Sequence, residues 1–213
     1  LGIHSPLGSS HILERLHSAH TGVNACIRRA RETVFWPGIT ADIKRLTEAC
    51  HNCHICSRYQ QSIQKEPLCS HPAPSRPWEK IGVDIFTFAD RDYLCTVDYL
   101  SGFYELDRLP SKKVTDIVYC LRQHMARHGL PTEVVTDNSP FNSAEFKRFA
   151  ERFEFQHTTS SPRYAQSNGK VENAVKTAKR IMIKAREAKT DPFLALLEWR
   201  NTPSEQLGPS PAQ

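Results

Sequence analysis

The chain has 213 residues, of which 39% are hydrophobic and 24% charged, a composition typical of a globular protein that buries its own core. No apolar run approaches the ~20 residues that a spanning helix needs, and no basic-then-apolar leader follows Leu1, so we expect no membrane span and no signal peptide in a chain cut from a longer one. The net charge of +5 permits a polyanionic partner without requiring one.

The first part of the chain, from residue 11 to residue 56, is expected to be helical. Leu13, Leu16 and His17 fall on one helical face, and Pro37-Gly38 interrupts the pattern before it resumes. Residues 59–77 are polar and rich in proline, which is typical of an interdomain linker.

The remainder predicts an α/β fold. The expected elements are strands at 80–88, 93–98 and 102–107, a helix at 114–128, a strand at 133–136, a helix at 144–152, a strand at 153–158, and helices at 167–189 and 192–200. Three strands in a meander followed by alternating helices and strands indicate a mixed sheet covered by helices.

A cluster of histidines and cysteines is the first candidate site. The seven cysteines are an odd number, which disfavours a secreted disulfide framework and favours a reducing, intracellular compartment. His17 and His20 on one helical turn, with Cys50 and Cys53, could close a tetrahedral structural zinc site.

The choice of cysteines stays open on the sequence. Cys53 and Cys56 form an equally good chelate, and His51 and His54 are further possible ligands. The alternative to a metal site is two surface histidines beside a chance group of cysteines.

Three carboxylates form the second candidate site. Asp84 interrupts an apolar strand, Asp137 directly follows another, and Glu172 opens the helix expected at 167–189. If they converge, they could hold two Mg²⁺ ions for in-line displacement at a phosphodiester. Taken singly, Asp137 could be a turn or cap residue and Glu172 a first-turn residue favoured by the helix dipole, and Asp98 competes with Asp84.

The helix that carries Glu172 is strongly basic. Eight Lys or Arg and two Glu lie between Arg163 and Lys189. Phosphate contact is the natural use of such a face, and a merely solvated outer face is the alternative. The expected DNA-binding residues are Lys170, Lys176, Lys179 and Arg180.

These stretches, taken in order and spacing, resemble the integrase of gypsy-type LTR retrotransposons from about Ile12 to Gln213. The resemblance is carried by His17-Ser-Ala-His20, Val34-Phe-Trp-Pro-Gly38, Cys50-x-x-Cys53, Lys65-Glu-Pro-Leu68, Arg76-Pro-Trp-Glu-Lys80, Val83-Asp-Ile-Phe86, His128-Gly-Leu-Pro131, Val135-Thr-Asp-Asn138, Thr158 to Tyr164, Gln166-Ser-Asn-Gly169 with Glu172, and Glu198-Trp-Arg-Asn-Thr-Pro203.

The resemblance implies a fold and a domain division. It predicts an RNase H-like core with a five-stranded mixed sheet flanked by helices, preceded by a small all-α HHCC zinc-binding domain. The expected division is an N-terminal extension at 1–11, the HHCC domain at 12–58, a linker at 59–77 and the catalytic core at 78–213.

The resemblance also assigns site residues. Asp84, Asp137 and Glu172 fall on the family's D, D, E positions, which hold Mg²⁺ or Mn²⁺. The family's spacing, counted forward from Trp36, places the zinc cysteines at Cys50 and Cys53. Counted back from the Lys65-Glu-Pro-Leu68 motif, it places them at Cys53 and Cys56. We favour the count from Trp36, because it stays inside the zinc domain and the other count crosses the linker.

One loop departs from the family pattern. Asp137 is followed by Asn-Ser-Pro-Phe, so Ser139 replaces a glycine and one residue is missing before Phe141. A glycine there would supply a backbone conformation or close approach that serine adopts less readily. The departure bears on activity more than on fold.

The expected function is therefore that of a retrotransposon integrase, which acts in the nucleus. It would trim DNA 3′ ends and join them to target DNA by two-metal phosphoryl transfer, as a homo-oligomer on element ends and target DNA. The alternative is a catalytically degenerate or host-adopted copy that serves as a DNA- or protein-binding module. A simple nuclease on the same fold is a third interpretation, which leaves the zinc domain without a role.

Overall fold

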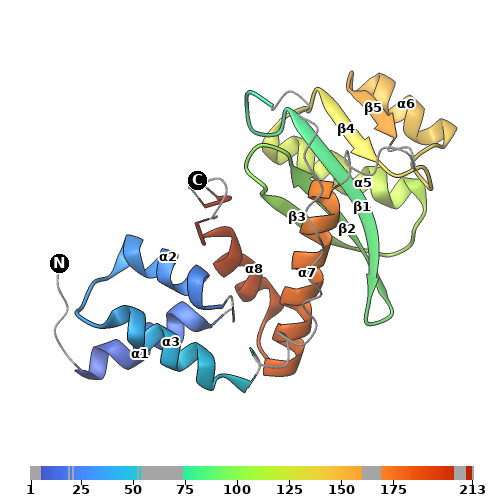
Figure 1. Cartoon of the computed structure of the whole chain (residues 1–213). Helices are drawn as coiled ribbons and strands as arrows, with labels where there is room; N and C mark the ends of the chain where they lie inside the picture. The colour runs from blue at the N-terminus through green and yellow to red at the C-terminus, as the bar shows by residue number, and fades with distance from the viewer. Residues whose placement is uncertain are drawn as a thin grey trace. The chain divides into compact units, whose positions relative to one another are not determined.

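The computed structural model describes residues 6–18, 20, 22–51, 53, 74–159, 169–203 and 210–212. Two compact units are present: the first comprises Leu1–Lys65 with Arg180–Gln213, and the second comprises Glu66–Lys179. Figure 1 shows their elements, and each unit is described by itself.

Three short helices open the first unit: α1 (Pro6–His17), α2 (Val23–Thr33) and α3 (Ile39–Ala49). Helix α2 starts after Gly22 (φ 91°) and α3 after Gly38 (φ 88°), a backbone conformation that glycine adopts without steric cost. Helix α1 begins at Pro6, within the predicted extension at 1–11 and before the expected helical start at residue 11. Proline is tolerated in the first turn of a helix, so Pro6 does not prevent this early start.

The core of these three helices is small. Its buried hydrophobic side chains are Leu16, Cys26, Ala30 and Ile43. So few apolar contacts give a module of this size little stability, which is why such modules commonly need a metal. The first unit also contains the end of α7 (Gly169–Ala188) and all of α8 (Pro192–Arg200), where Ile181 and Ala195 pack together.

A five-stranded mixed sheet forms the second unit, as predicted. Its strands are β1 (Lys80–Phe88), β2 (Arg91–Asp98), β3 (Tyr104–Leu109), β4 (Glu133–Thr136) and β5 (Gln156–Thr159), in the spatial order β3-β2-β1-β4-β5. The first three strands pair antiparallel, and β4 runs parallel to both β1 and β5. A two-residue turn joins β1 to β2, with Ala89 and Asp90 at positive φ as such hairpins require.

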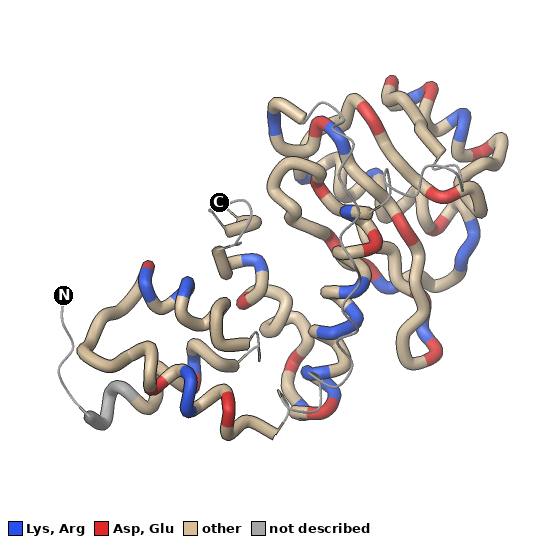
Figure 2. Tube along the Cα trace, in the orientation of Figure 1, with Lys and Arg blue, Asp and Glu red and all other residues tan. Residues whose placement is uncertain are grey.

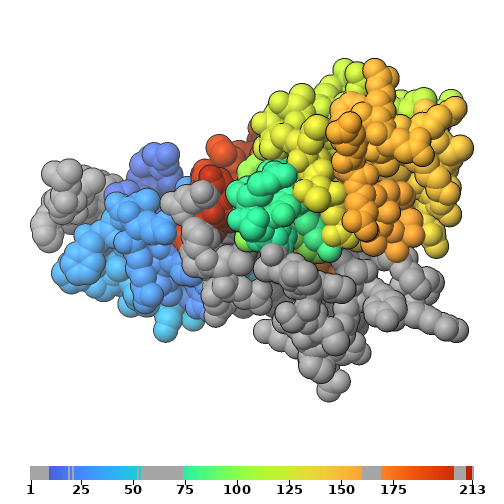
Figure 3. Space-filling view, turned by 90° about the horizontal axis from the view of Figure 1, so that it is seen from above, coloured from blue at the N-terminus to red at the C-terminus, as the bar shows by residue number. Residues whose placement is uncertain are grey.

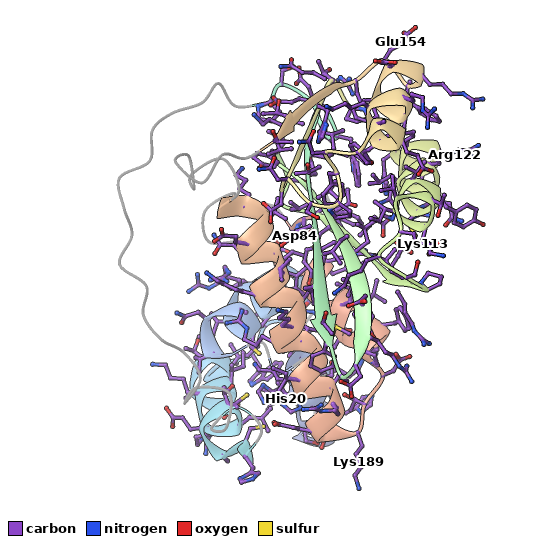
Figure 4. All side chains as sticks on the ribbon, turned by 90° about the vertical axis from the view of Figure 1, so that its right-hand side faces the viewer. His20, Asp84, Lys113, Arg122, Glu154 and Lys189 are labelled. Atoms are coloured by element: carbon purple, nitrogen blue, oxygen red, sulfur yellow. The ribbon has the colours of Figure 1, made fainter. Side chains whose placement is uncertain are left out.

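Alternate residues of β1 face opposite sides of the sheet. Ile81 and Val83 are fully buried in a core shared with α5 (Val114–His128) and α6 (Ala144–Arg152). Figure 4 shows α5 and α6 on one side of the sheet and the start of α7 on the other. Figure 3 shows α6 and β5 as one continuous surface, yellow to orange, at an end of this unit.

Strand β5 begins three residues later than predicted. Phe153 is the C-cap of α6, and Glu154 takes a positive φ of 56°, so neither residue can extend the strand. Apolar content alone could not reveal this helix ending. No helix among the described residues is both long enough and apolar enough to span a membrane.

Candidate functional site

The structure brings His17, His20, Cys50 and Cys53 together. His17 ends α1, His20 lies in the following turn, and Cys50 is the C-cap of α3. One ligand atom from each of the four lies within 4.8 Å of all the others. His17 Nε2 is 3.3 Å from His20 Nδ1 and 3.5 Å from Cys53 Sγ, and His20 Nδ1 is 3.3 Å from Cys50 Sγ.

These separations fit zinc. A tetrahedral ion with Zn–N of about 2.0–2.1 Å and Zn–S of about 2.3 Å separates its ligand atoms by roughly 3.3–3.8 Å. Two imidazoles and two thiols leave no open position, which is the donor set of a structural site rather than a catalytic one. The ring nitrogens differ: His17 turns Nε2 to the cluster, and His20 turns Nδ1.

The alternatives raised by the sequence are partly resolved. Cys50 and Cys53 both belong to the cluster, whereas His51 does not, although it is described. Cys56 and His54 lie outside the described residues. Among the described residues, the geometry forms the chelate predicted from the Trp36 register, and the alternative with Cys56 is not tested.

Burial favours the neutral forms of His17 and Cys53. Burial, with smaller contributions from His20 and Lys184, lowers the pKa of His17 to about 4, so its ring is neutral near pH 7. Burial raises the pKa of Cys53 to about 12, so this thiol keeps its proton until a cation displaces it. Zinc binding is thus coupled to proton release.

The ring nitrogen of His17 that faces away from the cluster has its own partner. His17 Nδ1 lies 3.8 Å from the Sγ atom of the buried Cys26, and that thiol donates to the Leu16 carbonyl at 3.3 Å. An outer partner of this kind fixes the tautomer and orientation of a zinc-binding imidazole. Nothing in the sequence pattern around Cys26 predicts this contact.

The carboxylate site lies on the face of the sheet opposite α5 and α6. Val83 of β1 is paired in register with Thr136 of β4, and these strands are parallel. Asp84 of β1 and Asp137, which directly follows β4, are the next residues along and are therefore neighbours. Asp84 is half-buried, whereas Asp137 is exposed. Figure 4 shows Asp84 on the side of the sheet that faces α7.

Glu172 approaches the two aspartates from the first turn of α7. It is exposed, and the adjacent Val171 is fully buried. Burial raises the pKa of Asp84, and the charges of Asp137 and Glu172 raise it further. The three carboxylates thus share one electrostatic environment, and oxygen ligands of this kind suit Mg²⁺.

The carboxylates are less tightly gathered than the zinc ligands. Among the described residues, the one group of three or more His, Cys, Asp or Glu within metal-binding reach is the His/Cys cluster. One Asp84 oxygen accepts a hydrogen bond from its own neighbour, the Ile85 backbone N–H, at 2.7 Å. A cation at this site must compete with that local contact.

Asp98, the competitor for Asp84, has a structural role. Its side chain is fully buried and accepts hydrogen bonds from the backbone of Trp78, Leu100 and Ser101 and from the Ser101 hydroxyl. Both oxygens are engaged in fixing the turn after β2, so little capacity is left for a metal ion.

The basic residues of α7 differ in their surroundings. Lys176 and Arg180 are exposed, and Lys179 Nζ lies 5.3 Å from the ring centre of Phe86. Lys170 donates to the Tyr99 carbonyl, a contact that a DNA phosphate would have to replace. Figure 2 shows Lys and Arg recurring along this helix.

The altered loop after Asp137 keeps its anchor. Phe141 is 1% exposed and makes an edge-to-face contact with Phe146, with ring centres 5.3 Å apart. Ser139 is not among the described non-glycine residues with positive φ, so the serine takes no left-handed backbone conformation here. The missing residue therefore leaves the aromatic anchor in the core.

Known proteins are similar to this chain in its zinc-binding part and over most of its length. The family described as integrase zinc binding domain matches residues 9–60. The uncharacterized protein K02A2.6 of Caenorhabditis elegans is 30% identical over 209 residues, which cover 95% of this chain. The transposon Tf2-3 polyprotein of Schizosaccharomyces pombe is 25% identical over 177 residues, or 76% of this chain. The chain spans 16% and 13% of the lengths of these two relatives.

Two solved structures share the fold. The catalytic core domain of BIV integrase covers 63% of this chain and 91% of its own, with a TM-score of 0.56 and 20% identity. A chain of the simian T-cell lymphotropic virus intasome, solved in complex with PP2A regulatory subunit B56 gamma, covers 94% of this chain and 73% of its own, with a TM-score of 0.62 and 20% identity.

Proposed function

The chain belongs to the integrases of gypsy-type LTR retrotransposons, and from that premise we propose that it trims DNA 3′ ends and joins them to target DNA. The observation that carries the proposal is the position of Asp84 on β1 beside Asp137, which directly follows the parallel strand β4, with Glu172 near enough to raise the pKa of Asp84. Perturbed carboxylates of this kind cluster at functional sites.

The proposed chemistry is two displacements at phosphorus. Water attacks a phosphodiester near the element's end and leaves a 3′-hydroxyl. That hydroxyl then attacks a phosphodiester of target DNA and displaces its 3′-oxygen, so one bond is formed for each bond broken. Neither step needs an external energy source.

Asp84, Asp137 and Glu172 would hold Mg²⁺, or Mn²⁺ in its place, which when bound supplies Lewis-acid stabilisation of negative charge on the phosphate oxygens. The exposure of Asp137 and Glu172 leaves the site open to a large substrate. Lys179, whose charge acts on Asp84 against the other two carboxylates, would draw the DNA phosphate to the site.

The other parts of the proposal concern structure and partners. His17, His20, Cys50 and Cys53 would hold structural Zn²⁺, and its binding energy would stabilise a module with a small core. Lys176, Lys179 and Arg180 would contact DNA phosphates, with Lys170 available once it leaves Tyr99. We propose that the chain acts as a homo-oligomer on DNA in the nucleus. We also propose the domain division expected from the sequence: an extension at 1–11, the zinc-binding domain at 12–58, a linker at 59–77 and the catalytic core at 78–213.

A joining assay tests the proposal. The chain is incubated with a labelled duplex that carries the element's terminal sequence, a plasmid target, and Mg²⁺ or Mn²⁺. We expect labelled plasmid from the unaltered chain and none from Asp84→Asn. Joining that is unchanged in Asp84→Asn would contradict the assignment.

A second candidate function rests on the loop that follows Asp137. Its Asn-Ser-Pro-Phe sequence departs from the family pattern beside the carboxylate site, which favours a copy that binds DNA or protein without joining. Metal-dependent DNA binding without joined product would select this candidate. Cleavage without joining would select a simple nuclease.

A further inference from the structure

Lys184 is a buried lysine on α7 with a partner in the zinc cluster. Its exposed fraction is 9%, and its Nζ donates to the backbone carbonyl of His20. Lysine is almost never fully buried unless it is paired, because removing an ammonium group from water is costly. The hydrogen bond to the His20 carbonyl offsets part of the cost of burying the Lys184 ammonium group.

His20 needs support at the carbonyl that Lys184 contacts. Its φ of 50° lies in the left-handed region, which non-glycine residues adopt at a cost, and its N–H donates to the His17 carbonyl at 2.9 Å. The backbone conformation of His20 sets the direction of its ring, whose Nδ1 faces Cys50. A donor that holds the His20 carbonyl therefore also orients a zinc ligand.

The charge of Lys184 acts in the same sense. Burial is the largest cause of the lowered pKa of His20 and of the raised pKa of Cys53, whereas the positive charge of Lys184 lowers the pKa of both groups. It favours neutral imidazole and ionised thiolate. These are the forms that bind zinc.

Two further contacts join the zinc-binding helices to the C-terminal segment within the same unit. Arg28 Nε donates to the Pro203 carbonyl at 2.9 Å, and Arg29 forms an ion pair with Glu198 of α8. Helix α2, which carries both arginines, also carries Cys26, the outer partner of His17. Residues 180–203 therefore contact both the zinc cluster and its supporting helix.

We propose that Lys184 is a positioning residue of the zinc centre, so that zinc binding and docking of residues 180–203 on the zinc-binding helices stabilise each other. The inference rests on the proposed zinc site and goes beyond it by assigning a role to a residue of α7. Coupling between two events is reciprocal: if zinc favours the Lys184 contact, loss of that contact weakens zinc binding.

Zinc affinity of the purified chain tests the inference, with zinc as the only ligand and a competing chelator as the reference. Lys184→Met keeps the length of the side chain and removes its charge and donors. We expect about 10-fold weaker zinc binding, the low end of the effect of losing an outer-shell partner. The matched control is Lys189→Met, an exposed position next to the end of the same helix, which should bind zinc as the unaltered chain does. Lys184→Arg, which keeps charge and donors, should recover part of the loss.

Hydrogen exchange on the unaltered chain gives a second measurement that does not depend on a variant. On chelation of zinc, backbone exchange should rise at residues 180–200 as well as at residues 10–50. Equal zinc affinity for Lys184→Met and Lys189→Met, or exchange that rises only at residues 10–50, would overturn the inference. Neither readout involves DNA, so failure of the joining reaction leaves this test unaffected, and a chain that binds no zinc overturns the zinc site itself.

Discussion

A Cβ atom at Gly82 would lie 2.0 Å from Val171 Cγ2, so the start of α7 rests directly on the backbone of β1. Asp84 lies two residues after Gly82 on the same face of the strand, and Glu172 directly follows Val171. The absence of a side chain at Gly82 therefore sets the distance between the strand and the helix that carry two of the three carboxylates.

Gly82→Ala should lower both stability and activity. Adding a methyl group to a packed contact costs about 1–3 kcal/mol, and α7 would have to move away from β1. Chemical denaturation and the joining assay measure the two effects. Gly169→Ala is the matched control, because a Cβ there meets no atom within 4 Å. Joining at the unaltered rate in Gly82→Ala would show that the position of α7 on β1 is not critical.

Asp84→Asn should stabilise the fold while removing activity. The pKa of Asp84 is raised in the folded chain, so its ionised form is disfavoured relative to the unfolded chain, and at pH 7 this carboxylate lowers the free energy of unfolding. In a metal-chelating buffer the variant should therefore melt at a higher temperature than the unaltered chain. The difference should shrink as pH falls toward the unfolded pKa of about 3.9.

Asp98→Asn provides the contrast. An amide cannot accept hydrogen bonds on both sides, so it would leave donors from Ser101 without their partner, at a cost of about 1–3 kcal/mol. We expect a lower melting temperature at pH 7. Destabilisation by Asp84→Asn of the same size as by Asp98→Asn would argue that Asp84 too has a structural role.

Substitutions at Cys26 should separate packing from hydrogen bonding at the zinc centre. Cys26→Val fills the buried space with apolar atoms but removes the partner of His17 Nδ1, and we expect about 10-fold weaker zinc binding. Cys26→Ser can still donate to the Leu16 carbonyl and accept from His17, so its zinc affinity should stay closer to that of the unaltered chain. The reverse order would mean that Cys26 contributes only packing.

Neutralising Lys176 should reduce the salt dependence of DNA binding. Each phosphate contact contributes about 0.7–0.9 to the slope of log affinity against log salt, so Lys176→Gln should lower the slope by roughly that amount. Binding titrations at several salt concentrations measure it. Arg122→Gln, an exposed position on α5, should leave the slope unchanged. Equal slopes for both variants would argue against phosphate contact by α7.

Much of the fold follows from local sequence. Short apolar runs separated by turn-length gaps identified β1 and β2, and a brief apolar run identified β4. The Cys50–Cys53 chelate followed from the family resemblance, counted from Trp36. The start of β5 could not be predicted, because Glu154 takes a left-handed conformation that no composition signal announces. The contacts of Lys184 and Cys26 were equally inaccessible, since they join segments whose proximity only the folded chain establishes. The role of Asp98 depends on backbone donors, which carry no sequence signal.

The most direct test of the integrase assignment compares two glutamates of one helix. Glu172 and Glu187 are both exposed on α7, and only Glu172 acts on Asp84. In the joining assay with Mg²⁺ or Mn²⁺, Glu172→Gln should abolish the joined product while Glu187→Gln keeps it, with zinc content unchanged in both. Equal joining by the two variants would contradict the account.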